Sequence, residues 1–129
     1  MIKDPRWKIS ELRKRSKQAL SFEYSGPGNR RIRAVPDERT LRYYTTKGLL
    51  DRPAEIRGRT AYYGWRHLLQ AVAIKRLQEK GLSLVEIQEQ LTGRPSEHLA
   101  KIARLPSRPA GEFLEEKSAK KTKDNERGN

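Results

Sequence analysis

The stretch RTLRYYTTKGLL, residues 39–50, decides how this sequence folds. Asp37 stands just before it, and an aspartate there caps a helix because its carboxylate accepts hydrogen bonds from the free amides of the first turn. Gly48 supplies a stop signal at the other end. The pattern predicts a short helix between these two residues, with Leu41 and Tyr44 on its inner face.

The outer face of this helix carries polar, charged and aromatic side chains. They are Arg39, Thr40, Arg42, Tyr43 and Lys47. The arginine fork matches phosphate oxygens and guanine edges, and a tyrosine hydroxyl can donate to phosphate. Two interpretations compete. Either the adjacent tyrosines are ordinary packing residues between solvated charges, or the helix lies on a polyanion.

The charge of the chain favours the polyanion. The 129 residues include 29 Lys and Arg against 16 Asp and Glu, which gives a net charge of +13 and a pI near 10.3. Residues 1–50 carry 13 basic and 5 acidic groups, whereas residues 106–129 carry 6 and 5. An excess of this kind in the folded part indicates a polyanionic partner. The alternative is a protein that is merely basic and soluble.

Composition also excludes several classes of function. The chain has no cysteine and only two histidines, His67 and His98, so no disulfide, thiolate site or metal cluster is expected. No pair of catalytic carboxylates, triad or phosphate-binding P-loop is present, so we expect neither an enzyme nor a cofactor. No secretory signal or apolar run long enough to cross a bilayer is visible, and we expect a cytoplasmic protein without a membrane role.

Helical spacing and turn signals predict the remaining elements. Apolar periodicity predicts helices over residues 9–20 and about 65–80, and a capping box of Ser83 and Glu86 begins a third. A short final helix, 97–105, would be capped by Ser96. Two further segments are less regular. The sequence around EIRGR in residues 51–63 predicts a hairpin, and SFEY and RRIRAV flank a turn as either a second hairpin or a loop.

We therefore expect one folded domain over residues 1–105, with an insertion at about 21–35, and a disordered polar tail over 106–129. Because the tail composition supplies little core, its removal is expected to leave the fold intact.

Residues 9–20 and 35–93 closely resemble the MerR (mercury-resistance regulator) family. The resemblance rests on RTLRYY followed by GLL, then on YY and on LLQAVAIKRLQEKGLSLVEIQEQL. It implies a mainly α, winged helix-turn-helix fold. It also implies a bacterial transcriptional regulator whose second helix enters the major groove while a hairpin wing grips the adjacent backbone.

By this resemblance, Arg39, Thr40, Arg42 and Tyr43 are the expected recognition-helix contacts. Tyr44 and Trp65 are expected in the core. Lys47 is a weaker candidate, because a lysine at a helix C-terminus also complements the helix dipole. The expected wing and flanking contacts are Arg57 and Arg59 as phosphate clamps, or simply exposed turn arginines, and Arg66 as a backbone contact.

The sequence departs from the family pattern in two places within the DNA-binding region. The insertion carries Arg30, Arg31 and Arg33, which suits a DNA-binding arm, a solvated loop or a partner site. The wing commonly ends in a Tyr-Arg-Arg-Tyr-like run, but residues 60–63 read Thr-Ala-Tyr-Tyr, so Tyr62 is left as a weaker polar contact.

A third departure concerns self-association. The helix after Gly93 meets Pro106 too soon for the long dimerisation helix of effector-sensing members, so the chain resembles a minimal, effector-less member. We expect a monomer that binds double-stranded DNA, with cooperative head-to-tail neighbours or RNA polymerase as further partners. The alternatives are an excisionase-like or architectural DNA-bending protein, and a protein-interaction adaptor.

Overall fold

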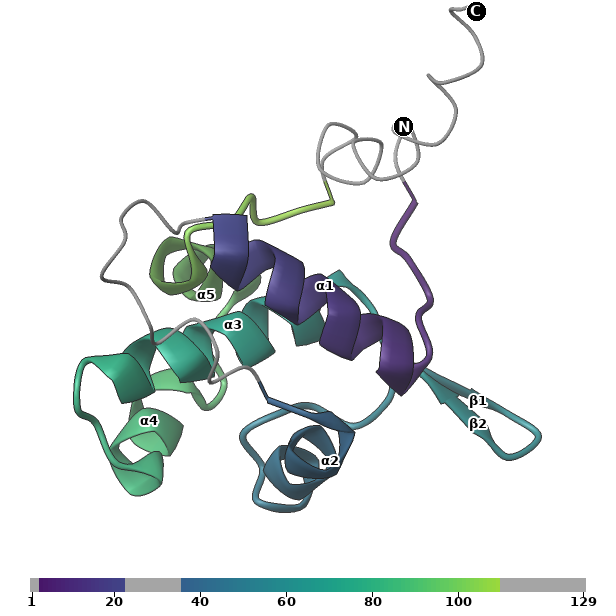
Figure 1. The fold of residues 1–129 in the computed structure, drawn as a ribbon, viewed down its shortest axis with the longest axis horizontal. Coiled ribbons are helices and arrows are strands. Elements are labelled where there is room, and N and C mark those ends of the chain that lie inside the picture. The colour runs from purple at the N-terminus through teal and green to yellow at the C-terminus, as the bar shows by residue number, and fades with distance from the viewer. Residues whose placement is uncertain (1–2, 23–35, 110–129) are drawn as a thin grey trace, which may run out of the picture.

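The computed structural model describes residues 3–22 and 36–109 and is drawn in Figure 1. Within these ranges the chain forms five helices and one antiparallel hairpin. They are α1 (Ile9–Phe22), α2 (Glu38–Thr46), β1 (Glu55–Arg57), β2 (Thr60–Tyr62), α3 (Trp65–Glu79), α4 (Leu84–Leu91) and α5 (Ser96–Ala103). The expected mainly α, winged helix-turn-helix fold is confirmed.

Helix α3 is the centre of the domain. Its side chains are buried nearly all round, and α1, α4 and α5 each pack against it (Figure 1). Leu68, Leu69 and Ile74 are fully buried there, and Trp65 is 2% exposed, as expected for a core tryptophan. Apolar side chains on several faces of one helix need neighbours on each of those faces, because exposure would leave hydrocarbon in water.

Helix α1 covers one side of this core. Leu12, Ser16 and Ala19 are buried on the face predicted from helical spacing, and the Ser16 hydroxyl donates to the Leu12 carbonyl oxygen at 2.9 Å. That hydrogen bond satisfies a polar side chain that burial would otherwise penalise. The helix continues to Phe22, two residues beyond the predicted end.

The segment before α1 adds a single bridge to the hairpin. Trp7 and Tyr63 exchange two backbone hydrogen bonds, with N–O distances of 2.8 and 2.7 Å. The Trp7 and Trp65 rings lie 6.2 Å apart between centroids. The base of the wing is thereby attached to both α1 and α3.

The last helix differs from its prediction. It begins at Ser96 with Pro95 as the capping residue, and it ends at Ala103, where Arg104 adopts a left-handed conformation with φ 61°. Ser96 is therefore the first residue of the helix and not its cap, and its hydroxyl accepts a hydrogen bond from Arg66. The predicted start at residue 97 and cap at Ser96 were therefore wrong.

Two predicted segments fall largely outside the described residues, namely the insertion beyond Phe22 and the tail beyond Pro109. The described part of the tail, residues 106–109, remains with the domain, since the Pro106 carbonyl oxygen accepts from Trp65 Nε1 at 2.9 Å. Among the described residues, no helix is long and apolar enough to cross a membrane, and no three His, Cys, Asp or Glu side chains gather as a metal site.

Candidate nucleic-acid interface

Helix α2 begins and ends as its sequence predicted. Asp37 Oδ1 accepts from the Thr40 amide at 2.8 Å, and this hydrogen bond holds the pKa of the Asp37 carboxyl below its usual value of 3.8. At the other end the Tyr44 carbonyl oxygen accepts from the amides of Leu49 and Leu50, at 2.9 and 3.2 Å. Gly48 makes this reversal with φ 79°, a conformation that glycine adopts without steric cost. Both leucines are buried and fix the end of the helix to the core.

The two adjacent tyrosines point in different directions. Tyr44 is 3% exposed and donates from its hydroxyl to Gln78 Oε1 at 3.4 Å, and burial raises its pKa above 10.0. Tyr43 is 47% exposed, with Lys47 Nζ 5.7 Å from its ring centroid. The expected difference in burial is present, with Tyr44 in the core and Tyr43 on the surface.

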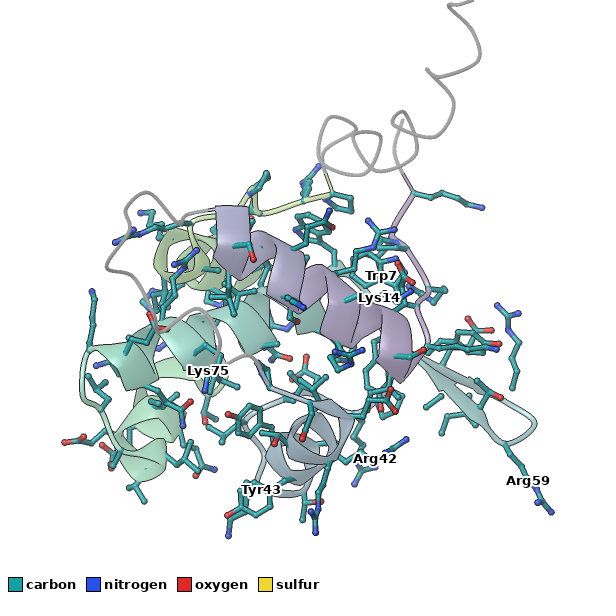
Figure 2. All side chains as sticks on the ribbon, viewed as in Figure 1. Trp7, Lys14, Arg42, Tyr43, Arg59 and Lys75 are labelled. Atoms are coloured by element: carbon teal, nitrogen blue, oxygen red, sulfur yellow. The ribbon has the colours of Figure 1, made fainter. Side chains whose placement is uncertain are left out.

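The outward face of α2 is mostly basic. Arg39, Arg42 and Lys47 are exposed, while Thr40 is half-buried beside the Asp37 cap. Burial raises the pKa of the Tyr63 hydroxyl and the Arg42 charge opposes this, so Arg42 lies within electrostatic range of the wing base. Figure 2 shows Arg42 and Tyr43 on α2, and Arg59 on the wing, along the lower side of the molecule. The structure thus brings together candidates that the sequence holds apart.

Helix α4 contacts the C-terminal end of α2. Gln88 Nε2 donates to the Lys47 carbonyl oxygen at 3.1 Å, and a Cβ on Gly48 would lie 3.4 Å from the same nitrogen. Gln88 was not among the predicted site residues. Its sequence position shows only an exposed polar residue on α4, and no local pattern links it to α2.

The wing is a hairpin that turns at Gly58, where φ is 63°. Glu55 pairs with Tyr62 and Arg57 pairs with Thr60 in the antiparallel register. Because side chains alternate along a strand, Glu55, Arg57 and Tyr62 share one face, while Ile56 lies on the other.

Arg57 and Arg59 differ in how firmly they are held. Arg57 Nε donates to Glu55 Oε2 at 2.6 Å, and its guanidinium carbon lies 4.8 Å from the Tyr62 ring centroid. Arg59 is exposed and makes no hydrogen bond or ion pair with the rest of the described chain. One predicted phosphate clamp is therefore oriented by its neighbours, and the other projects into solvent.

Arg66 lies in an internal network. Its Nε donates to Asp51 Oδ2 at 2.9 Å, NH1 to the Ser96 hydroxyl at 3.1 Å, and NH2 to the Arg94 carbonyl oxygen at 2.7 Å. Gln70 completes the network by donating to Asp51 Oδ1 and accepting from the Asp51 amide, both at 3.0 Å. These bonds favour a structural role for Arg66, whose contact with DNA stays a prediction.

Asp51 is the acceptor at the centre of this network. Partial burial would raise the pKa of its carboxyl, but the hydrogen bonds from Gln70 and Arg66 outweigh it and hold that pKa below 3.8. The carboxylate is therefore charged near neutral pH. Through Arg66, it connects the linker between α2 and the wing with the turn between α4 and α5.

His67 joins the two chain segments at the base of the wing, at Gly64 and Arg52. Its Nδ1 accepts from the Gly64 amide at 3.0 Å, so the ring proton sits on Nε2, which lies 2.8 Å from the Arg52 carbonyl oxygen. Burial lowers the pKa of this histidine below 6.5, against the opposing effects of the Arg52 carbonyl, Asp51 and Asp4. The neutral ring is the form that fits both partners.

Three candidates from the insertion, Arg30, Arg31 and Arg33, lie outside the described residues. Sequence reasoning missed another basic residue, Arg6, which bonds to Glu55 Oε1 at 3.3 Å and to Asp4 Oδ2 at 2.6 Å. The charge pattern of the first ten residues gave no signal for this contact with the wing.

Comparison with known proteins identifies the helix-turn-helix part of the chain. Residues 37–93, from the cap of α2 to the end of α4, match the MerR HTH family of regulatory proteins. No curated protein and no solved structure gives a significant match. The match includes the outward residues of α2 and the whole wing.

Proposed function

Because residues 37–93 form a MerR-family helix-turn-helix domain of a DNA-binding transcription regulator, we propose that this protein is a bacterial regulator that recognises a specific double-stranded DNA sequence. In this proposal α2 enters the major groove and the wing grips the adjacent phosphate backbone. Regulation of bacterial DNA would place the protein in the cytoplasm. The folded domain is proposed to extend beyond the predicted boundary at residue 105, because the Pro106 carbonyl oxygen accepts from Trp65 Nε1.

The observation that carries the proposal is the division of α2 into two faces. Leu41 and Tyr44 anchor it to the core, while Arg42 and Tyr43 stand exposed on the other side. A rigid helix that presents arginine can form bidentate contacts with guanine O6 and N7. The cap, the Tyr44 carbonyl and Gln88 hold the helix at both ends, so its side chains are presented on a fixed backbone.

The proposed contacts fall into three groups. Arg39, Thr40, Arg42 and Tyr43 read or align on the groove, with Lys47 near its edge. Arg57, Arg59 and Tyr62 contact backbone phosphates from the wing. Arg30, Arg31 and Arg33 are proposed to supply an additional basic arm.

A second candidate function, architectural DNA bending of the excisionase type, is favoured by one side chain. Ile56 is 64% exposed on the wing, directly before Arg57 in the chain. Exposed aliphatic side chains next to arginines are used to unstack base steps and bend DNA from the minor groove. Binding of unrelated sequences with similar affinity would support this function over site-specific regulation.

Neighbouring copies on DNA are a proposed partner. Val85 is 65% exposed on α4 near Glu86 and Glu89, whereas the wing presents Ile56 and Arg59. Figure 1 shows α4 and the wing at opposite ends of the domain, with α2 between them. Copies bound in one orientation could therefore meet wing to α4, a head-to-tail arrangement that need not close. RNA polymerase remains a second proposed partner.

The test is a binding titration of the full chain on DNA from upstream of its own gene, against shuffled DNA of equal length and composition. A specific regulator is expected to prefer the first by roughly a thousandfold or more at one salt concentration. Equal binding that falls steeply with salt would indicate association with the backbone alone. That result would contradict site-specific recognition of this DNA and favour the architectural function.

A further inference from the structure

The wing carries a carboxylate where a DNA-binding surface would ordinarily avoid one. Glu55 begins β1, next to the arginines expected to hold phosphate, and it is only partly exposed. A negative charge there repels DNA unless it performs some other task. Its hydrogen bonds indicate what that task is.

Glu55 and Tyr62 together fix the guanidinium of Arg57. The 2.6 Å hydrogen bond uses only Nε, and the guanidinium carbon lies over the Tyr62 ring, 4.8 Å from its centroid. Neither terminal NH₂ group hydrogen-bonds within the described residues, so both can donate elsewhere, and the Arg57 side chain is 60% exposed. Paired N–H groups in a fixed plane match two oxygens of one phosphate.

The carboxylate that holds Arg57 is itself braced. Its other oxygen accepts from Arg6 Nε at 3.3 Å, and Arg6 is held in turn by Asp4 at 2.6 Å. The backbone bridge between Trp7 and Tyr63 keeps this N-terminal segment against the wing. Glu55 is thus positioned from both sides, and Arg57 takes its orientation from a fixed partner.

We propose that Glu55 is a positioning residue for DNA binding, which with the Tyr62 ring holds Arg57 ready to clamp a backbone phosphate. This inference rests on the proposed DNA-binding function and assigns a role to Tyr62 where the usual wing arginines are missing. Ordering a long side chain before binding removes an entropic cost from association. The proposal requires the gain from this order to exceed the repulsion between the Glu55 carboxylate and the DNA phosphates.

The sharpest test compares two substitutions of equal charge, Glu55→Gln and Glu55→Ala, in the full chain. Gln keeps an oxygen that can accept from Arg57 Nε, whereas Ala removes it. If charge alone mattered, both variants would bind DNA more tightly and to the same extent. We expect Glu55→Ala to bind about threefold to tenfold more weakly than Glu55→Gln, the scale for releasing one ordered side chain.

The pair is then measured in two further backgrounds. In Arg57→Ala the difference between Gln and Ala at position 55 should vanish, because nothing remains to be positioned. In Arg6→Ala it should become smaller but persist, because Arg6 holds the Glu55 carboxylate and does not itself position Arg57. Tyr62→Phe should keep the difference between Gln and Ala at position 55, and Tyr62→Ala should reduce it, since the ring of Tyr62 and not its hydroxyl orients Arg57.

Each variant is titrated against a duplex selected by the full chain from random sequences and against a scrambled duplex, with melting temperatures as the control for folding. Loss of a phosphate clamp should weaken binding to both duplexes equally. Equal affinity of Glu55→Gln and Glu55→Ala, or a difference that survives in Arg57→Ala, would overturn the inference. If the natural chain bound the selected and scrambled duplexes equally, specific recognition would be contradicted. The clamp could still be measured on either duplex.

Discussion

The guanidinium of Arg66 donates to the carboxylate of Asp51, Nε to Oδ2, at 2.9 Å, and its two NH₂ groups reach the α4–α5 turn. One side chain therefore connects the linker that follows α2 with a turn on the far side of α3. The spacing between α2 and the wing depends on that linker. Its geometry therefore bears on the proposed DNA binding, whether or not Arg66 contacts DNA.

Replacement of Arg66 by Ala should lower the free energy of unfolding by about 1–3 kcal/mol, because three acceptors lose a charged donor. Arg66→Lys should recover little of this, since an ammonium cannot reproduce the planar fork. Urea unfolding followed by circular dichroism measures both. Full stability in Arg66→Lys would show that charge alone, and not the planar fork, matters at this position.

The two tyrosines of α2 give a paired prediction on stability. Tyr44→Ala removes a ring that is 3% exposed and should cost about 3–5 kcal/mol, as for other buried aromatic residues. Tyr43→Ala, at a side chain 47% exposed, should change stability by no more than about 0.5 kcal/mol. Thermal and urea unfolding would test this, and similar losses for both variants would contradict the division of α2 into two faces.

Much of this domain could be predicted because its signals are local. Helix α2 could be predicted from the Asp37 cap and the Gly48 stop, and α4 from the Ser83–Glu86 capping box. The hairpin could be predicted from the turn signal in EIRGR. Each signal lies within a few residues of its element. Tyr43 and Tyr44 could likewise be assigned to opposite environments, because helical spacing places only Tyr44 beside Leu41.

The contacts that sequence reasoning missed are long-range. Nothing near Trp7 indicates that its backbone pairs with Tyr63, and nothing near Gln88 indicates a hydrogen bond to Lys47. Serine is a common helix cap, but the hydroxyl of Ser96 accepts a hydrogen bond from Arg66, which is distant in sequence. Such partners are chosen by tertiary packing, which single-sequence patterns do not encode.

The end of the folded domain gives a third prediction. Because Trp65 Nε1 donates to the Pro106 carbonyl oxygen, a chain ending at residue 105 lacks this acceptor for a largely buried tryptophan. We expect that truncation to cost about 1–3 kcal/mol, a fall of at least about 4 °C in melting temperature for a domain of this size. A chain ending at residue 109 should melt like the full chain. Equal melting of both truncated chains would instead favour the boundary predicted at 105.

Arg42 gives the prediction closest to recognition. Arg42→Ala should reduce the affinity for a selected duplex by about 1–3 kcal/mol if it makes a bidentate base contact, and should reduce the preference at one base position. Lys101→Ala on α5 removes the same charge from an exposed site on a helix that lies across α3 from α2 in Figure 1, and serves as the control. Equal weakening on all sequences would indicate a phosphate contact. Unchanged affinity would remove Arg42 from the interface.

His67 predicts how stability depends on pH. Burial lowers its pKa below 6.5 in the folded state, so the unfolded chain takes up the proton at higher pH than the folded chain does. Stability should therefore be full above about pH 6.5 and should fall as the pH drops below it. The pKa values of Asp37, Asp51 and Glu55 are lowered from 3.8, 3.8 and 4.5, so the losses from these carboxylates come at still lower pH.

Unfolding by urea at pH 7.5 and pH 5.5 measures this dependence. His67→Gln keeps an acceptor and a donor but cannot titrate, so its stability should change less between the two pH values than that of the natural chain. His98→Gln, at the other histidine, should retain the natural dependence. Because His67 joins Gly64 to Arg52, protonation should also loosen the wing base, which exchange of the Gly64 amide would report. An unaltered pH dependence in His67→Gln would show that another group carries it.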